Sequence, residues 1–313
     1  MQPIPGIHHI TAFAKDPQTN IDFYQQVLGQ RLVKTTINFD DPGTYHFYYG
    51  DEVGTPGTIL TFFPWPMAAR GKPGNGEVAA VAYAIRPESL AYWRNHLAEQ
   101  NLGVQEETRF GATVLIVADV DGMAVELVVD DAAATIAPWT NGPIPAEHAL
   151  RGFHSATLWV SQAEPTVQLL IGSMGYKVVA QEGNRFRLKA DGNEAGSFLD
   201  VLERVGWGRG RVGAGSIHHI AFRTASDESQ LAYQQALSQV GMRVTPVQDR
   251  QYFHSIYFRE PNGILFEIAT DPPGFATDET ITELGSSLKL PPWLEPHRRE
   301  IEGVLPPINR GNS

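Results

Sequence analysis

A unit of strand, helix and glycine repeats four times along this chain, and this repeat constrains the fold more than any other feature. Four apolar segments predict the opening strands, at residues 7–14, 78–83, 153–160 and 217–222. A predicted helix follows each of them, over residues 20–28, 88–100, 164–174 and 227–240. Each helix is expected to end at or near a glycine, because the residue past a helix end often turns left-handed, where a Cβ is unfavourable. These glycines are Gly29, Gly103, Gly175 and Gly241.

Each copy also closes with a glycine followed by a short apolar strand. The glycines are Gly57, Gly122, Gly196 and Gly263, and the fourth residues after them are Thr61, Glu126, Asp200 and Glu267. Turn sequences precede two of these strands, as expected for hairpins. The sequence therefore predicts an α+β fold of four βαβββ modules.

We expect consecutive modules to pair, which divides the chain into two domains. Residues 1–137 would hold the first two modules and residues 153–272 the last two. A proline- and glycine-rich linker is expected at 138–152, and a C-terminal arm at 273–313.

Composition narrows the functional classes. The chain contains no cysteine, which excludes disulfides, thiolate metal ligands and a cysteine nucleophile. A formal net charge of −11 argues against nucleic acid as a partner. No segment resembles a membrane span or a secretory signal, so we expect a cytoplasmic protein, with a homodimer as a possible assembly.

Two pairs of histidines stand in matching positions of the first and fourth modules. His8 and His9 lie in the segment GIHHITAF, and His218 and His219 lie in SIHHIAF. Adjacent side chains on a strand face opposite sides, so one histidine of each pair is expected to bind a metal and the other to lie behind it or beside a substrate.

Glu267 is the best candidate for a third ligand. It lies between Phe266 and Ile268 on a closing strand, where an unpaired carboxylate would cost several kcal/mol. Two imidazoles and one carboxylate form the facial triad of non-haem Fe(II) oxygenases, which leaves positions open for substrate and O2. Mn(II) suits the same ligands, and Zn(II) also binds such sets. Glu126 has no matching histidine, and we interpret it as structural.

These modules, with their IHHI openings and GxxxE close, resemble the vicinal oxygen chelate superfamily. Within it, the chain is similar to ring-cleaving dioxygenases that act on hydroquinones. The resemblance extends over nearly the whole chain and implies an Fe(II) enzyme that opens an aromatic diol with O2. It implies His9, His219 and Glu267 as ligands, taken from modules one and four. Ser155 occupies the ligand position of module three, with His154 in the non-ligand position.

The resemblance further implies catalytic roles for residues around the ligands. His8 and His218 would move protons, and Thr11 lies two residues after the first ligand. Tyr257 is expected on the strand opposite Glu267, where a phenol could hydrogen-bond the substrate. Arg250 could offset anionic charge, although the sequence alone favours a surface arginine paired with Asp249. His254 has no matching position and is expected to be structural or to line the pocket. The catalytic candidates are thus His8, Thr11, His218, Arg250 and Tyr257.

Three other functions remain open at this point. A glyoxalase-type lyase or isomerase generally needs a second carboxylate on the closing strand of the partner module, where this chain has Thr61. A metal-free protein that binds an aromatic compound would leave the paired histidines unexplained. A zinc hydrolase is disfavoured because the chain lacks the helical HExxH pattern. Metal analysis and oxygen uptake distinguish these functions.

Overall fold

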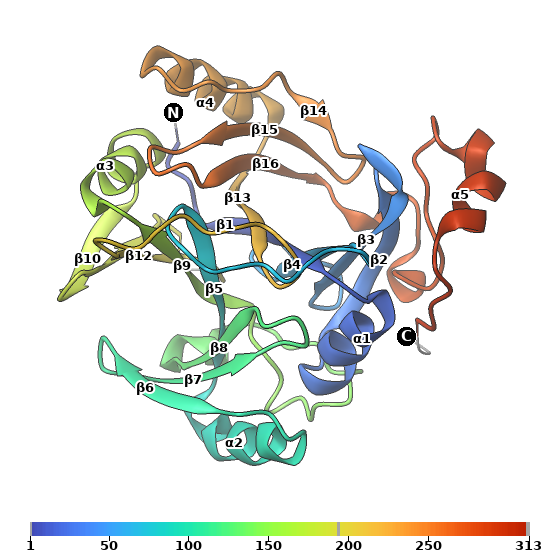
Figure 1. Cartoon of the computed structure of the whole chain (residues 1–313), viewed down its shortest axis with the longest axis horizontal. Coiled ribbons are helices and arrows are strands. Elements are labelled where there is room, and N and C mark those ends of the chain that lie inside the picture. Colours follow the sequence, from blue (N-terminus) through green and yellow to red (C-terminus); the bar gives the residue numbers. More distant parts are fainter. Residues whose placement is uncertain (1, 193–194, 311–313) are drawn as a thin grey trace.

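The structure is a computed structural model that describes residues 2–192 and 195–310 (Figure 1). Within them the strands form two eight-stranded sheets, and the four predicted βαβββ modules are confirmed. The first module comprises β1 (Ile7–Ala14), α1 (Pro17–Asp22), a π-helical turn (Phe23–Val27), β2 (Arg31–Asn38), β3 (Asp41–Gly50) and β4 (Ile59–Pro64). The second comprises β5 (Glu77–Ile85), α2 (Leu90–Glu99), β6 (Gln105–Arg109), β7 (Ala112–Ala118) and β8 (Ala124–Val129).

The third and fourth modules repeat this order. The third comprises β9 (Phe153–Val160), α3 (Ala163–Met174), β10 (Lys177–Glu182), β11 (Arg185–Lys189) and β12 (Phe198–Glu203). The fourth comprises β13 (Ile217–Thr224), α4 (Asp227–Gln239), β14 (Gln248–Asp249), β15 (Phe253–Arg259) and β16 (Leu265–Pro273). The segment 138–152, where a linker was expected, forms neither helix nor strand.

The sheets join modules that are not consecutive, and this corrects the expected pairing. The strand order of one sheet is β14-β15-β16-β13-β1-β4-β3-β2, which combines modules four and one. The other sheet has the order β10-β11-β12-β9-β5-β8-β7-β6, which combines modules three and two. Each opening strand pairs with its own closing strand and leaves a second edge whose backbone groups need partners. That edge of β1 pairs antiparallel with β13, and the edge of β5 with β9.

Three of the four predicted helix-ending glycines adopt the left-handed conformation. Gly29, Gly175 and Gly241 have φ of 67°, 79° and 87°. In the second module the left-handed residue is Asn101, with φ of 55°, and it replaces the predicted Gly103. Asparagine tolerates this conformation better than most residues with a Cβ, so the helix ends two residues earlier than its glycine suggests.

The C-terminal segment 274–310 packs against β2 and β3 and includes α5 (Arg298–Val304) (Figure 1). A fully buried ammonium anchors it, because Lys34 Nζ lies 2.5 Å from both Asp278 Oδ1 and Glu279 Oε2. The amide of Lys289 also donates to the carbonyl of Thr35. The edge of β2 is thereby covered.

Replacing Lys34 by Met is expected to lower the free energy of unfolding by about 3–5 kcal/mol, because it leaves two carboxylates, one of them buried, without their cation. Urea unfolding monitored by circular dichroism measures this loss. The exposed Lys72→Met variant is the matched control and should unfold with the midpoint of the unmodified protein. Equal midpoints for both variants would contradict the anchoring role.

Candidate metal centre

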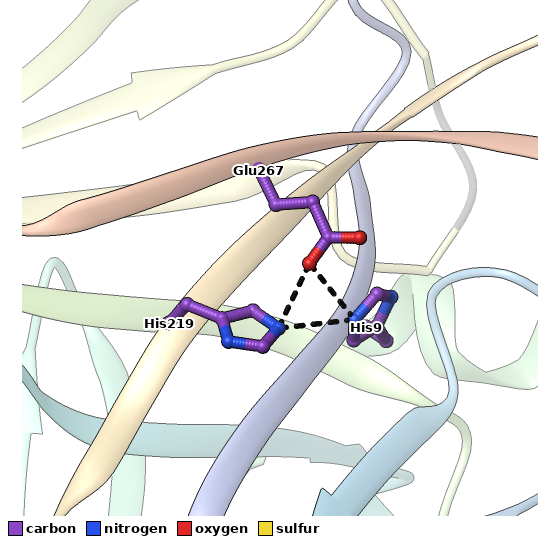
Figure 2. Close-up of side chains that lie close together, drawn as sticks. All are labelled: His9, His219 and Glu267. Carbon is purple, nitrogen blue, oxygen red and sulfur yellow. Dashed lines mark hydrogen bonds and ion pairs between the residues drawn. The ribbon is translucent and has the colours of Figure 1, made fainter. Parts of the chain in front are cut away.

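His9, His219 and Glu267 come from three adjacent strands of the first sheet. They lie on β1, β13 and β16, which are neighbours in the order β16-β13-β1. In the register of the sheet, His219 lies opposite Thr11, and Glu267 lies beside Ala221. Alternate residues share a face, so these positions direct all three side chains to one side (Figure 2). The pairing of modules one and four is what brings residue 9 to residues 219 and 267.

The three side chains meet with ligand atoms turned toward one another. Nε2 of His9 lies 3.3 Å from Nε2 of His219. Glu267 Oε2 lies 2.8 Å from the His219 nitrogen and 3.4 Å from that of His9. Ligands at adjacent corners of an octahedral ion, each bonded at about 2.1 Å, are about 3 Å apart. The spacing and the donor types therefore fit a divalent cation held by one face of its coordination sphere.

The charge of Glu267 supports this fit. The side chain is fully buried, and burial by itself raises the pKa of a carboxyl group. The imidazoles of His9 and His219 outweigh burial and hold the pKa of Glu267 well below its usual range, so it is ionised at neutral pH. Ser255 donates a hydrogen bond to its Oε1 and thereby orients the carboxylate. Among residues 2–192 and 195–310, its Oε2 has no close polar partner besides the two imidazoles.

In each pair, the ligand candidate (His9 or His219) is the inner histidine and its neighbour (His8 or His218) is the outer one. The outer histidines contact the inner ones through ring nitrogens. His8 Nδ1 lies 2.9 Å from His9 Nδ1, and His218 Nδ1 lies 2.9 Å from His219 Nδ1. A register shift in the β1–β13 pairing lies between Ile7 and His9, which lets adjacent side chains approach each other. An imidazole that binds a metal through Nε2 typically donates its Nδ1–H to an acceptor behind it. Here that acceptor is a second imidazole.

Burial keeps these outer rings neutral. It lowers the pKa of His8 well below its ordinary value and that of His218 to about 3. The two differ in position, because His218 faces the cavity beside the three converging residues, whereas His8 lies in a separate depression with Phe253 and Phe275.

A cavity of about 340 Å³ opens in front of His9 and His219. This volume suits a small organic ligand. Aromatic and polar side chains from modules one and four line it, including residues of the β2–β3 turn and of the segment before β15. The lining residues are His9, Thr11, Asn38, Phe39, Asp40, His46, Tyr48, Phe63, His218, His219, Thr245, Gln248, Arg250, Phe253, Tyr257 and Leu265.

The structure brings most of the predicted catalytic residues to this cavity. Tyr257 lies directly opposite Glu267 in the β15–β16 register, as expected. Burial raises the pKa of Tyr257, so its phenol stays protonated. Arg250 Nε donates to the Tyr257 hydroxyl over 3.2 Å, and Arg250 Nη1 lies 3.0 Å from Asp40 Oδ2. The sequence alone predicted that Arg250 pairs with Asp249, and this prediction is wrong. The β2–β3 turn of module one brings Asp40 to Arg250 instead.

Thr11 also lines the cavity, whereas His254 does not. His254 Nδ1 pairs with Asp227 at 2.6 Å, outside the cavity. His8 is the one predicted catalytic residue outside the cavity lining among the residues that the structure describes. It contacts the centre only through His9.

In the second sheet, guanidinium groups pair with the carboxylates at the closing positions, Glu126 and Asp200. Arg109 Nη1 lies 2.7 Å from Glu126 Oε2, which fits the structural interpretation of Glu126. Arg187 makes two hydrogen bonds to Asp200, of 2.8 and 2.9 Å. His154 Nδ1 contacts the hydroxyl of Ser155 at 3.0 Å. Module three thus keeps the outer histidine of the pair and has a serine in place of the inner one. Here arginines neutralise the buried carboxylates.

Sequence reasoning missed His46, Tyr48 and Ser255. His46 and Tyr48 lie two residues apart on β3, so both side chains face the cavity. Their signal was present in the alternation of YHFYY, but the partner of β3 had to be known before a face could be assigned. Ser255 lies two residues before Tyr257 on β15 and shares its face.

Comparison with known proteins places this arrangement among related chains. The model of the Glyoxalase/Bleomycin resistance protein/Dioxygenase superfamily matches residues 6–127 and 152–268. "Putative ring-cleaving dioxygenase MhqO" of Bacillus subtilis is 47% identical over 302 residues, which is 96% of each chain. "Chlorohydroquinone/hydroquinone 1,2-dioxygenase" of Sphingobium indicum is 36% identical over 310 residues, which is 95% of each chain.

Solved structures agree on the fold. The crystal structure of a "putative dioxygenase" from Bacillus subtilis superposes with a TM-score of 0.95 at 44% identity, and 100% of each chain is covered. Glyoxalase I from Zea mays reaches a TM-score of 0.63 at 14% identity, covering 85% of this chain and 92% of its own. At that identity the likeness concerns the fold alone.

Proposed function

Because the chain belongs to the glyoxalase/bleomycin resistance protein/dioxygenase superfamily, we propose that it is an Fe(II)-dependent dioxygenase that cleaves the ring of a hydroquinone-like diol with O2. The convergence of His9, His219 and Glu267 in front of a cavity of about 340 Å³ carries this proposal. A relative named for chlorohydroquinone and hydroquinone supports the substrate class. The proposal includes a cytoplasmic location, and it leaves the homodimer as an expectation.

The ligand set accounts for the choice of metal. Two neutral imidazoles and one carboxylate leave three corners of an octahedral ion open, as O2-activating iron sites require. When bound, Fe(II) would supply electrons to O2 and a charge that binds a phenolate oxygen of the diol. Mn(II) is the alternative that the same ligands accept.

The chain's own residues would hold and polarise the substrate. Tyr257 keeps its proton and can donate a hydrogen bond to an oxygen of the bound diol, while the charge of Arg250 behind it stabilises anionic character. The neutral imidazole of His218 faces the cavity, and because its Nδ1 accepts from His219, its Nε2–H can donate a proton to an oxygen of the bound diol. Phe63 and Phe253 line the same space and give it apolar walls. His8 does not line the cavity and would orient the ring of His9.

Anaerobic reconstitution tests the proposal. The protein is loaded with Fe(II), Mn(II) or Zn(II), and O2 uptake is measured with hydroquinone, methylhydroquinone and catechol. Uptake of one O2 per diol with the Fe(II) protein, and loss of the aromatic absorbance, are expected. If the Fe(II) protein consumes no O2 with any of the diols, the proposal is wrong. A separate assay without O2 offers the protein a hemithioacetal, the kind of substrate that glyoxalase-type enzymes convert. Conversion of this compound would favour a lyase.

Replacing His218 by Phe is expected to spare the metal site and slow turnover by about 10- to 100-fold, because general acid–base groups contribute that order of rate. Metal content by mass spectrometry and kcat by O2 electrode measure the two effects separately. The matched variant His154→Phe alters the corresponding histidine of the second sheet and should turn over like the unmodified protein. Undiminished turnover in His218→Phe would remove its role.

The lyase alternative loses support at one position. The closing-strand residue of module one is Thr61, and its hydroxyl donates to Thr11 instead of facing the converging ligand atoms. A second carboxylate is therefore lacking where a glyoxalase-type site needs one.

A further inference from the structure

A hydrogen-bonded chain of four side chains runs across the first sheet and ends beside the candidate metal centre. The Tyr48 hydroxyl lies 2.9 Å from His46 Nδ1, and His46 Nε2 lies 2.8 Å from Thr61 Oγ1. Thr61 Oγ1 in turn donates to Thr11 Oγ1 over 2.8 Å. Resting on the proposed function, we infer that Tyr48, His46 and Thr61 position the Thr11 hydroxyl as a hydrogen-bond donor to an anionic oxygen of the bound substrate.

The sheet register explains why these residues meet. Thr61 on β4 lies between Thr11 on β1 and Tyr48 on β3, at the same level of all three strands. His46 is two residues from Tyr48 on β3 and shares its face. Thr61 occupies the closing position that holds Glu267 in module four, so module one uses the position as a link between side chains.

The direction of the chain follows from counting protons. A threonine hydroxyl has one proton, and Thr61 gives its proton to Thr11. His46 must then donate its Nε2–H to Thr61, because Thr61 can only accept in that contact. Burial lowers the pKa of His46 well below its ordinary value, so the ring is neutral and its Nδ1 can only accept. The hydroxyl of Tyr48 is therefore the donor to Nδ1.

The last proton of the chain is directed to the cavity. Thr11 accepts from Thr61, and its hydroxyl donates no hydrogen bond within residues 2–192 and 195–310. Thr11 is fully buried and lines the inner wall of the cavity, two residues from His9 and on the same face of β1. A donor fixed before the substrate binds stabilises developing negative charge without reorganisation. Each bond behind it polarises the next, which strengthens the final donor.

Thr61 offers a test because it does not line the cavity and cannot touch the substrate. Thr61→Val keeps the shape and breaks the chain, and we expect kcat with the diol to fall about five- to tenfold with little change in KM. Thr61→Ser keeps the hydroxyl and should restore kcat. Thr11→Val should lower kcat more, by about 10- to 100-fold. Tyr48→Phe should lower kcat less than Thr61→Val does.

Coupling distinguishes positioning from a structural effect. The double variant Thr11→Val with Thr61→Val should be no slower than Thr11→Val alone, since Thr61 acts only through Thr11. Metal content is measured for every variant and should be unchanged. Thr157→Val, at the position of the second sheet that corresponds to Thr11, is the matched control and should leave kcat unchanged. If the two losses of kcat multiply in the double variant, or if Thr61→Val has a normal kcat, the inference is wrong.

Two readouts are independent of turnover. ¹⁵N NMR of the metal-free protein should show the His46 ring protonated at Nε2 and bare at Nδ1, with the signal assigned by a His46→Gln variant; the opposite tautomer overturns the direction of the chain. Anaerobic titration of the Fe(II) protein with 4-nitrophenol should show several-fold weaker binding in Thr11→Val and Thr61→Val. If the unmodified protein consumes no O2 with any diol, the proposed function is wrong. The tautomer of His46 and the 4-nitrophenol titration still test the hydrogen-bonded chain from Tyr48 to Thr11.

Discussion

Replacing Glu267 by Gln is expected to abolish tight metal binding and to lower O2 uptake by more than about 1,000-fold. The carboxylate supplies the only negative charge among the three converging ligands, and its Oε2 is the atom that faces both imidazoles. Glutamine keeps the volume but offers a neutral oxygen, and hard divalent cations bind a neutral amide much more weakly than a carboxylate. Metal content after desalting, measured by mass spectrometry, and O2 consumption with a hydroquinone give the result.

Glu126→Gln is the matched control. Glu126 occupies the same position on the closing strand of module two, and it is also buried, but Arg109 neutralises it. This variant leaves a buried guanidinium with less compensation and should lower stability, while metal content and turnover remain those of the unmodified protein. Full metal occupancy and activity in Glu267→Gln would refute the metal site, whatever the control shows.

The metal-free protein is expected to lose stability steeply as the pH falls below about 6.5. Its folded state keeps several histidines neutral by burial, whereas the unfolded chain protonates them near their ordinary pKa. The unfolded state therefore binds more protons below pH 6.5, and the free energy of unfolding decreases as pH decreases. Burial lowers the pKa of five histidines: His8, His46, His154, His218 and His219.

The size of this effect includes an opposing contribution. Each such histidine lowers the free energy of unfolding by up to about 1.4 kcal/mol per pH unit, until the pH reaches its folded pKa. That value is about 4 for His154 and about 3 for His218. Burial also raises the pKa of Glu77 to about 7 and of Asp119 to about 6, so these carboxyls take up protons in the folded state and stabilise it. The five histidines outnumber these two carboxyls, so the free energy of unfolding still decreases as the pH falls below about 6.5.

Chelated protein is titrated from pH 8 to pH 3.5, with urea unfolding at each pH. Replacing His154 by Gln, away from the metal centre, should reduce the slope between pH 4 and 6.5 by about 1.4 kcal/mol per pH unit. Bound metal should move the midpoint to lower pH, since it stabilises the folded state only. A stability independent of pH between 7 and 5 contradicts the burial of neutral histidines.

Several features of the site could be predicted from sequence because they are local. The opening strands 7–14 and 153–160 have the predicted bounds, since an apolar run between a glycine and a helix start is a local pattern. The positions of His9, His219 and Glu267 on their strands followed from the same repeats. His46 and Tyr48 could not be assigned, because a strand of mixed aromatic and polar residues has two faces and its sequence does not say which faces the cavity.

The repeats by themselves determined four βαβββ modules, the strand that carries each histidine pair and the residue type at each closing position. Only the tertiary structure decided that modules one and four share one sheet, that His8 lies outside the cavity and that Arg250 reaches Asp40. The reason is that hydrophobic periodicity and turn residues act over a few neighbours along the chain. The pairing of β1 with β13 sets Ile10 opposite Ile220, and a contact between such distant parts of the chain is not specified by any local pattern.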